Sequence, residues 1–282
     1  MNLILLRADE LDGDRQVTLT DRRFVHIRDV LRASVGDRLR VGVLDGERLN
    51  AEIVSWSHDA CVLRLGEAFE PLPEPRIDLL LALPRPKCLR RLWPQIAAMG
   101  VARIFIVNAE RVERNYWGSR FLDPEAYQPL VEEGLEQAGD TRMPEIRILR
   151  RLKPLVEDEL ATGYADGCKL VAHPRRGEDG DKGDKGLINF SGAGRVLVAV
   201  GPEGGWSDYE LRLFEANGFQ RFGLGARTLR TDTACIALLA IVESKLSFTP
   251  SLVEDCCSGA AIGDRGRFRP QRGQPQGRSC EL

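Results

Sequence analysis

Residues 196–205 read Val-Leu-Val-Ala-Val-Gly-Pro-Glu-Gly-Gly. The first half is a Val-rich apolar run, which predicts a buried strand of a parallel sheet. The second half is a turn, in which glycine permits backbone conformations and close approaches that a Cβ atom would forbid. Ser207 then begins a helix, with Glu210 three positions further on, as in a capping box. Open α/β sheets bind small ligands at such turns, although a tight connection without a ligand has the same pattern.

A second loop of the same character follows further along the chain. Residues 219–224 predict another strand, and residues 225–234 then read Gly-Ala-Arg-Thr-Leu-Arg-Thr-Asp-Thr-Ala. An apolar helix is expected from about Thr231 onward. We expect the bends after these two neighbouring strands to lie at the same edge of one sheet and to form one pocket jointly.

Length and composition narrow the class of protein. The chain has 282 residues, 43% hydrophobic and 29% charged, which suits one large or two ordinary globular domains. No apolar run approaches the length of a membrane span, and the first residues predict a short strand rather than a signal peptide. The seven cysteines form no Cys-x-x-Cys pair. This pattern favours a reducing cytoplasm and argues against a zinc site.

The first 72 residues have a mostly β pattern. Short alternating runs, with Asp45-Gly46 as a hairpin signal, predict a small barrel. One helix is expected over about residues 21–32, with Phe24, Ile27, Val30 and Leu31 on one apolar face. Residues 71–75 read Pro-Leu-Pro-Glu-Pro and predict a stiff linker.

Strands alternating with helices beyond the linker predict a mostly parallel sheet. Two segments there look unstructured. Residues 177–186 repeat Gly-Asp-Lys without an apolar side chain, which indicates a surface loop. The tail from about residue 250 is rich in Gly, Pro, Arg and Gln, which is typical of disorder.

The charged and aromatic residues do not decide whether the chain binds nucleic acid. The formal net charge of −2 gives no support for nucleic-acid binding. Four basic residues nevertheless fall within seven positions: Arg85, Lys87, Arg90 and Arg91. They fit a phosphate-binding track, with a solvated helix face, the commoner origin of such charge runs, as the alternative. Trp93, Trp117 and Trp206 fit base stacking, but such residues more often fill cores.

Several motifs in this order resemble the bacterial 16S ribosomal RNA uracil-N3 methyltransferases of the RsmE type, which belong to the SPOUT class. The resemblance covers about residues 1–248. The motifs are the His-Ile stretch ending at Arg32, Arg85-Pro86-Lys87, Glu136-Gln137-Ala138-Gly139 with Arg142, Ala172-His173-Pro174, Gly201-Pro202-Glu203-Gly204-Gly205, and Leu224-Gly225 with residues 229–234. Asp232 departs from the family pattern, since it stands where Glu is usual. Asp140 also departs, because it falls where a basic residue is common.

The resemblance implies an α/β fold: a trefoil-knotted SPOUT domain with a mostly parallel sheet, preceded by a small PUA-like β-barrel. The implied organisation is an RNA-binding barrel over residues 1–72, a methyltransferase domain over 76–248 and a disordered tail over 249–282. A knot is not something that periodicity predicts, since chains rarely thread loops. The implied activity is methylation of uracil N3 with S-adenosylmethionine as cofactor. The implied partners are 16S ribosomal RNA or the small ribosomal subunit and a second copy of the chain.

The resemblance places the cofactor in a cleft formed by three loops. The residues it assigns to cofactor binding are Ala172, His173, Pro174, Gly201, Pro202, Glu203, Gly204, Gly205, Leu224, Gly225, Leu229 and Arg230. Backbone groups of the last two loops are suited to recognise adenine. For His173 the alternative is a histidine at a strand end that bonds a neighbouring carbonyl group.

Methyl transfer to uracil N3 requires loss of the N3 proton. The enzyme needs a base near N3, or cations and N–H donors at the flanking carbonyl oxygens. Arg230 is the leading candidate for the electrostatic role, with a salt bridge to Glu203 or Asp232 as the alternative. Asp232 is a candidate base if burial raises its pKa, and the alternative is a helix N-cap role for Thr231 or Asp232. Glu203 orients either the loop or the base.

Recognition of the RNA is assigned to basic side chains: Arg32, Arg85, Lys87, Arg90, Arg91 and Arg142. The alternative function is a catalytically silent RNA-binding or ribosome-assembly factor with the same fold. Binding of S-adenosylmethionine distinguishes the two. A generic nucleotide-binding α/β protein is disfavoured, because neither a P-loop nor a GxGxxG motif is present.

Overall fold

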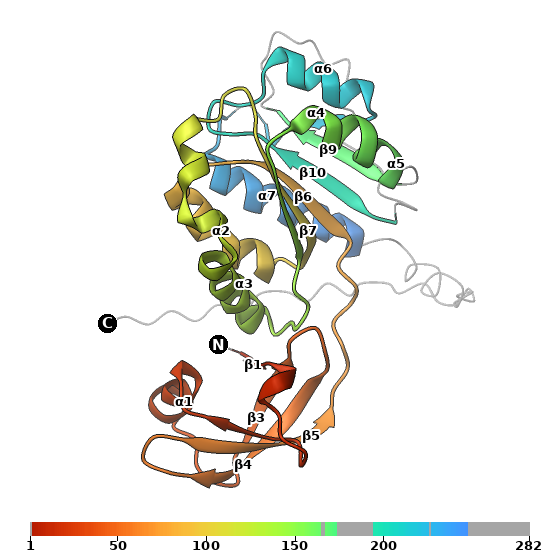
Figure 1. Cartoon of the computed structure of the whole chain (residues 1–282). Helices are drawn as coiled ribbons and strands as arrows, with labels where there is room; N and C mark the ends of the chain where they lie inside the picture. Colours follow the sequence, from red (N-terminus) through yellow and green to blue (C-terminus); the bar gives the residue numbers. More distant parts are fainter. Residues whose placement is uncertain (1, 165–166, 174–193, 226, 248–282) are drawn as a thin grey trace, which may run out of the picture. The chain divides into compact units, whose positions relative to one another are not determined.

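The structure is a computed structural model that describes residues 2–164, 167–173, 194–225 and 227–247 (Figure 1). Three expectations from the sequence lie outside these residues: the cofactor-binding assignment of Pro174, the surface loop at 177–186 and the disordered tail at 249–282. The division into domains at residues 72 and 76 stays a prediction.

A six-stranded parallel sheet forms the larger part of the described chain. Its strands lie in the order β11-β9-β10-β6-β7-β8. Their bounds are β6 Ile77–Ala82, β7 Val101–Val107, β8 Glu145–Leu149, β9 Cys168–Ala172, β10 Val196–Val200 and β11 Gln220–Phe222. All five residues of β10 are buried, as expected for a central strand of a sheet covered on both faces. The expectation that β10 and β11 are neighbours is wrong, because β9 lies between them.

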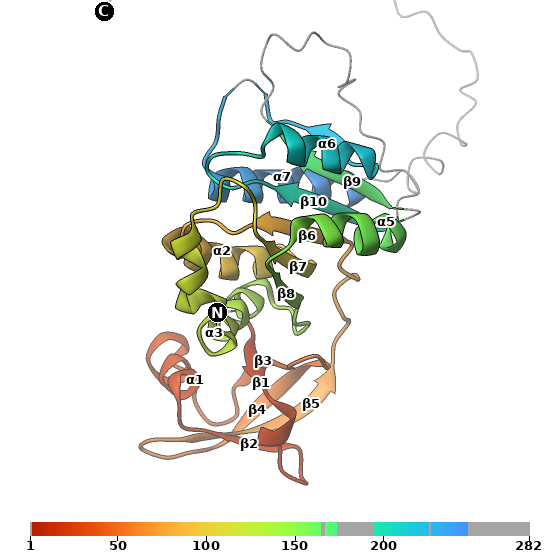
Figure 2. The same cartoon turned by 45° about the horizontal axis from the view of Figure 1, so that its top comes forward.

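Helices cover both faces of this sheet (Figures 1 and 2). Helices α2, α3 and α7 pack together on one face, while α6 and the α4–α5 segment lie on the other. Their bounds are α2 Pro86–Ala98, η3 Arg114–Gly118, η4 Arg120–Leu122, α3 Pro124–Ala138, α4 Leu152–Pro154, η5 Leu155–Glu159, α5 Leu160–Gly163, α6 Asp208–Ala216 and α7 Thr231–Ser247. Within the described residues, no helix combines the length and the apolar character needed to cross a bilayer.

The N-terminal residues form a separate five-stranded sheet with its own apolar core. Its strands lie in the order β1-β3-β4-β5-β2, in which β1 and β3 are parallel and the other pairs antiparallel. The bounds are β1 Ile4–Leu6, η1 Ala8–Glu10, β2 Gln16–Leu19, α1 Arg22–His26, η2 Ile27–Leu31, β3 Arg38–Val43, β4 Arg48–Trp56 and β5 Cys61–Ala68. The core contains Phe24, Ile27, Leu49, Ile53 and Leu63.

The helix expected over residues 21–32 differs from its prediction. After α1 the chain continues as the π-helix η2, which has a wider turn than an α-helix. Phe24 and Ile27 are buried as predicted, but Val30 is 66% exposed and Leu31 is 43% exposed. The wider turn rotates the last residues away from the face on which a 3.6-residue period places them. The prediction of a single apolar face is therefore wrong for Val30 and Leu31.

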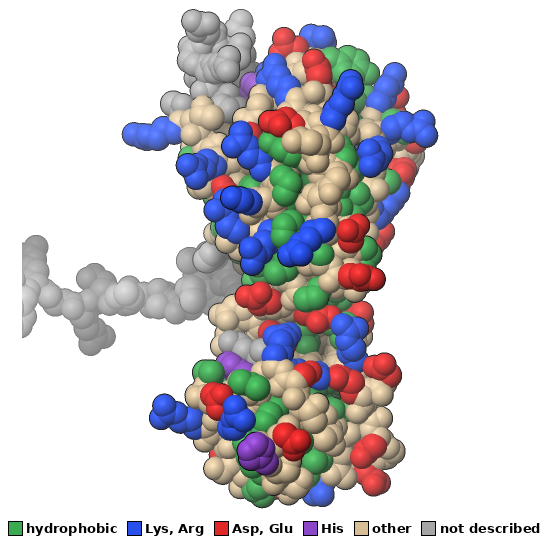
Figure 3. Space-filling view, turned by 60° about the vertical axis from the view of Figure 1, so that its left-hand side comes forward, with side chains coloured by type: hydrophobic (Ala, Val, Ile, Leu, Met, Phe, Trp, Pro, Cys, Tyr) green, Lys and Arg blue, Asp and Glu red, His purple; other side chains and the backbone are tan. Residues whose placement is uncertain are grey.

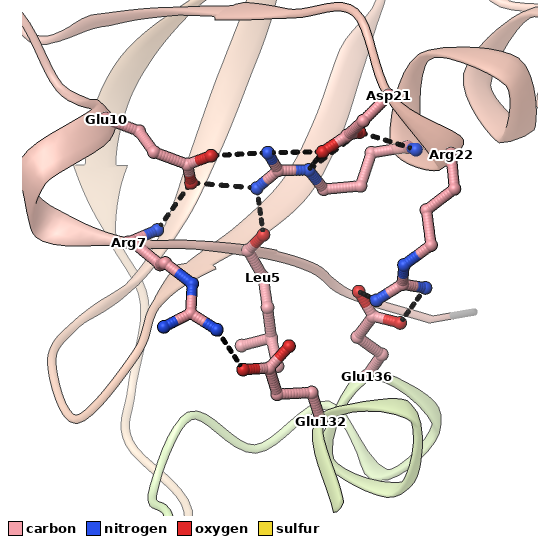
Figure 4. Close-up of polar contacts among 8 residues, drawn as sticks. Leu5, Arg7, Glu10, Asp21, Arg22, Glu132 and Glu136 are labelled. Carbon is pink, nitrogen blue, oxygen red and sulfur yellow. Dashed lines mark hydrogen bonds and ion pairs between the residues drawn. The ribbon is translucent and has the colours of Figure 1, made fainter. Parts of the chain in front are cut away.

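Contacts join the five-stranded sheet to α3 (Figure 4). The backbone N–H groups of Asn2 and Leu3 both donate to the Glu136 carbonyl oxygen at 3.0 Å. The buried Glu136 carboxylate accepts two hydrogen bonds from Arg22, at 3.0 and 3.1 Å. Arg7 pairs with Glu132 on the same helix at 2.5 Å. Backbone and side-chain bonds thus act together at this contact.

A buried carboxylate holds the amino ends of the central strands together. Asp78 of β6 is fully buried and accepts hydrogen bonds from Arg195 at 2.6 Å, from Arg103 at 2.8 Å and from Tyr164 at 2.5 Å. Burial alone would raise the pKa of Asp78, but these three donors lower it overall. Burial and the adjacent Asp78 charge raise the pKa of Tyr164, so that its hydroxyl remains a donor.

Replacement of Asp78 by Asn is expected to lower the free energy of unfolding at neutral pH by about 2 kcal/mol, because two arginines then face a neutral group. The folded-state pKa of Asp78 lies below its ordinary value of 3.8. Its contribution is therefore complete above that value and is lost as pH falls through the folded-state pKa. Denaturant unfolding at several pH values checks this. The difference between wild type and Asp78→Asn should shrink on acidification, and a constant difference would contradict the assignment.

Candidate active site

A pocket of about 300 Å³ lies at the carboxyl edge of the six-stranded sheet. This volume falls at the lower end of the range for small-molecule sites, about 300–1,000 Å³. Three segments line most of it, each at the end of a parallel strand: residues 172–173 at the end of β9, residues 200–206 at the end of β10, and residues 222–225 with 227–229 at the end of β11. Strand register explains why they meet. Ala199 of β10 is level with Val171 of β9, and Phe222 of β11 is level with Ala172 of β9, so that all three segments leave the sheet at one edge.

The loop after β10 is fixed by local bonds. Gly205 has a φ of +70°, in the left-handed region that glycine favours, and its N–H donates to the Pro202 carbonyl at 2.8 Å. The predicted capping box is confirmed: the Ser207 hydroxyl accepts from the Glu210 N–H, and the Glu210 carboxylate accepts from the Ser207 N–H. Helix α6 therefore starts at a defined point directly beyond the pocket.

Gly201 provides space for an aromatic ring. A Cβ atom on Gly201 would lie 3.2–3.3 Å from three atoms of the Trp206 indole, closer than ordinary van der Waals contact. The other side of the indole meets the ring of Phe214 edge to face, with a centroid distance of 4.8 Å. The turn thus holds a tryptophan that is only 3% exposed at the border of the pocket.

The loop that follows β7 holds the turn after β10 in place through hydrogen bonds. The Arg111 guanidinium donates to the carbonyl oxygens of Gly204 at 2.8 Å and Trp206 at 3.3 Å. The adjacent Glu110 N–H donates to the buried Glu210 carboxylate at 2.8 Å. A Cβ atom on Gly204 would come within 3.1 Å of the Arg111 side chain. Gly204 is therefore required for the approach of Arg111, a residue that the sequence analysis missed.

Two predicted catalytic carboxylates are tied to helix α2. Glu203 accepts a hydrogen bond at 3.0 Å from the Arg85 N–H, at the start of that helix. Asp232 pairs with Arg91 at 2.6 Å and also accepts from the Thr233 N–H at 3.0 Å. Helix α2 thereby connects the loop after β10 with the first turn of α7.

Arg230 directly precedes α7 and has an exposed side chain. Its carbonyl oxygen accepts from the Ala234 N–H at 2.8 Å, which fixes the backbone there. The alternative of a salt bridge to Glu203 or Asp232 is wrong, because those carboxylates bond Arg85 and Arg91 instead. Within the described residues, the Arg230 guanidinium has no ion pair.

The pocket unites most residues that the family resemblance assigned to the cofactor. Those that line it are Ala172, His173, Gly201, Pro202, Glu203, Gly204, Gly205, Leu224, Gly225 and Leu229. Arg230 is not part of the lining, although its neighbours Leu229 and Thr231 are. The sequence analysis missed Arg111, Val200, Phe222, Gly223, Ala234 and Leu238 as lining residues. It named Arg227, Thr228 and Thr231 only as part of the loop after the second strand, and it considered Trp206 only for base stacking or a core position. Thr231, Ala234 and Leu238 follow the helical period of α7, a signal that was available.

The predicted RNA-binding residues fall into two groups. Arg85, Lys87, Arg90 and Arg32, which directly follows η2, have exposed side chains. Lys and Arg side chains gather on the face that carries α2 (Figure 3). Arg91 is also exposed, but it pairs with Asp232. Arg142 pairs with Asp140 at 3.1 Å and donates to the Pro73 carbonyl at 2.8 Å. RNA binding by each of these residues stays a prediction.

The three tryptophans considered for base stacking differ in burial and in the partner of their indole N–H. Trp93 is fully buried and donates to the Phe121 carbonyl at 3.0 Å, so that it is a core residue. Trp206 is buried at the pocket, as described above. Trp117 is half-buried and donates to Asn108 at 2.8 Å, while Arg150 lies over its ring at 4.7 Å. The core interpretation therefore holds for Trp93, and neither Trp93 nor Trp206 is available for base stacking.

Comparisons with known proteins agree with this architecture. Residues 70–243 match the model of the RNA methyltransferase domain family. Ribosomal RNA small subunit methyltransferase E of Treponema pallidum is 31% identical over 86% of this chain and 90% of its own. Ribosomal RNA small subunit methyltransferase E 1 of Borreliella burgdorferi is 24% identical over 87% of this chain and 99% of its own.

A solved structure shares the fold. The ribosomal RNA small subunit methyltransferase E from Neisseria gonorrhoeae, bound to S-adenosyl methionine, has a TM-score of 0.68 and 22% identity, with 86% of this chain and 97% of that chain covered. Fold and family model together define an RNA methyltransferase. The chain belongs to the RsmE-type family of ribosomal RNA small subunit methyltransferases.

Proposed function

We propose that the protein methylates N3 of a uridine in 16S ribosomal RNA of the small ribosomal subunit, with S-adenosylmethionine as cofactor. The observation that supports this most is the pocket at the carboxyl edge of the sheet, lined by the glycine-rich turn after β10 and the loop after β11. Its position is where open α/β sheets bind ligands, and family membership supplies the reaction class.

The residues present fit the cofactor. Gly205 lets the backbone come close to a ligand, because a Cβ atom there would point into open space, and main-chain groups of residues 222–225 are suited to recognise adenine. The cofactor supplies a methyl group on a sulfonium centre, and the protein positions that group against the base and excludes water. Arg111, Glu203 and Glu210 hold the turn in shape through the bonds described above.

Arg230 has the electrostatic role in this proposal. Uracil N3 becomes nucleophilic only when its proton is lost, and negative charge then develops on the flanking carbonyl oxygens. An exposed guanidinium beside the pocket, with no ion pair within the described residues, is suited to bind those oxygens. Asp232 and Glu203 act as positioning residues, since Arg91 and the Arg85 N–H engage their carboxylates.

The remaining family properties complete the proposal. The larger sheet is a trefoil-knotted SPOUT domain, and the five-stranded sheet is a PUA-like barrel that contacts RNA. The active form is a homodimer in the cytoplasm, where ribosomal subunits assemble. Light scattering on the purified protein tests the dimer: twice the mass of the chain is expected, and the mass of one chain at micromolar concentration would contradict it.

RNA is expected to lie along the basic side chains at the start of α2. Lys87→Ala with Arg90→Ala removes two exposed cations. This double variant should bind RNA more weakly, and the slope of log K against log salt should become shallower by about two, the expectation for two lost phosphate contacts. Fluorescence anisotropy with a labelled ribosomal RNA fragment measures both. Arg142→Ala is the matched control, because Asp140 already pairs with that guanidinium. An unchanged slope in the double variant would remove these residues from the interface.

Mass spectrometry of ribosomal RNA tests the function itself. Cells that lack the protein should lose one N3-methyluridine from 16S ribosomal RNA, and re-expression of the wild-type protein should restore it. Purified protein with S-adenosylmethionine should methylate small subunits from the deficient cells. Retention of every methyluridine in the deficient cells would contradict the proposal.

A further inference from the structure

Trp206 is only 3% exposed, yet its indole N–H has no hydrogen-bond acceptor within the described residues. Such groups are rare, because burial without a partner costs free energy. Two other tryptophans of the same part of the chain do have partners: Trp93 donates to the Phe121 carbonyl and Trp117 to Asn108. The unpartnered donor therefore needs an explanation specific to its place.

That place is the border of the pocket. Trp206 lines the pocket beside Gly201, and the nitrogen edge of its indole is the part that a Cβ atom on Gly201 would meet. Only the backbone of Gly201 lies against this edge, and the indole nitrogen itself is buried in the protein without ligand. The ring is held by Phe214 on one side, and Arg111 binds the Trp206 carbonyl oxygen. A buried donor that the protein leaves without a partner, in a residue that lines the pocket, is suited to bond an acceptor of a bound ligand once the turn at Gly201 adjusts to that ligand.

We propose that the Trp206 indole N–H donates a hydrogen bond to S-adenosylmethionine when it binds in this pocket. The inference rests on the proposed function, and it assigns to Trp206 a direct contact in place of base stacking. S-adenosylmethionine has acceptors of the required kind in its adenine nitrogens, ribose hydroxyl groups and carboxylate. S-adenosylhomocysteine keeps all of these and is therefore a suitable probe.

Nuclear magnetic resonance of the wild-type protein tests the contact directly. The chain has four tryptophans, so ¹⁵N-tryptophan labelling gives four indole signals. The signal absent from Trp206→Phe identifies Trp206. On saturation with S-adenosylhomocysteine this signal should shift downfield, as expected for a new hydrogen bond, and its hydrogen exchange should slow. An unchanged Trp206 signal at saturation would overturn the inference.

Calorimetric titration gives the energetic test. Trp206→Phe keeps an aromatic ring but lacks the donor, and it should bind S-adenosylhomocysteine about tenfold more weakly. Trp117→Phe is the matched control, because it loses a donor that bonds Asn108 outside the pocket, and its affinity should equal that of wild type. Equal affinities of wild type and Trp206→Phe would refute the contact. Absence of binding by the wild-type protein would instead overturn the proposed cofactor site, and the contact with it.

Discussion

Arg230→Ala is expected to lower the turnover number for RNA methylation by about 100-fold or more, the usual effect of removing one donor that stabilises developing negative charge. The affinity for S-adenosylmethionine should change much less, because the Arg230 side chain does not line the pocket. The fold should survive, since this exposed guanidinium has no ion pair within the described residues. Arg230→Lys should recover part of the rate through its charge, without the paired donors of a guanidinium.

Single-turnover methylation of small subunits, together with calorimetry of cofactor binding, measures the two effects separately. Arg221→Ala is the matched control, because this arginine lies on β11 and pairs with Glu215 at 2.5 Å. Its variant should methylate at the wild-type rate. Turnover of Arg230→Ala within about twofold of wild type, far less than the loss of such a donor causes, would remove Arg230 from the mechanism.

Gly201→Val is expected to weaken binding of S-adenosylmethionine by about 100-fold, the upper range for forcing extra atoms into a packed site. The first added atom already lies within 3.2–3.3 Å of the Trp206 ring, and the branched side chain extends further. The indole must then move, and its displacement deforms the turn that lines the pocket. Calorimetric titration measures the loss, and thermal unfolding confirms that the variant is folded.

Gly163→Val is the control for this substitution. A Cβ atom on Gly163 meets nothing within 4 Å, and its φ is not in the left-handed region. Its variant should bind the cofactor with wild-type affinity. If Gly201→Val also binds normally, the turn after β10 does not border the cofactor.

Local patterns in the sequence predicted the elements that frame the site. The run Val196–Val200 and the Ser207–Glu210 capping box depend on burial and on bonds within a few residues, and both are confirmed. The order of parallel strands has no local signal. The position of β9 between β10 and β11 therefore emerged only from the structure.

Contacts between distant residues explain the other differences. Arg111 lies 93 positions before Gly204, so no spacing rule connects the two. The pairing of Asp232 with Arg91 spans 141 positions, and it replaces the salt bridge with Arg230 that stood as the alternative. The π-helix η2 has a local cause instead, because a wider turn changes which face Val30 occupies without any change in the apolar pattern.

The central claim is that the turn after β10 and the loop after β11 together bind the methyl donor. A crystal structure of the protein with S-adenosylhomocysteine tests it most directly. The account predicts the ligand between Gly201–Trp206 and Leu224–Leu229, in contact with both loops. A ligand bound elsewhere, with these two loops packed only against protein, would contradict the account.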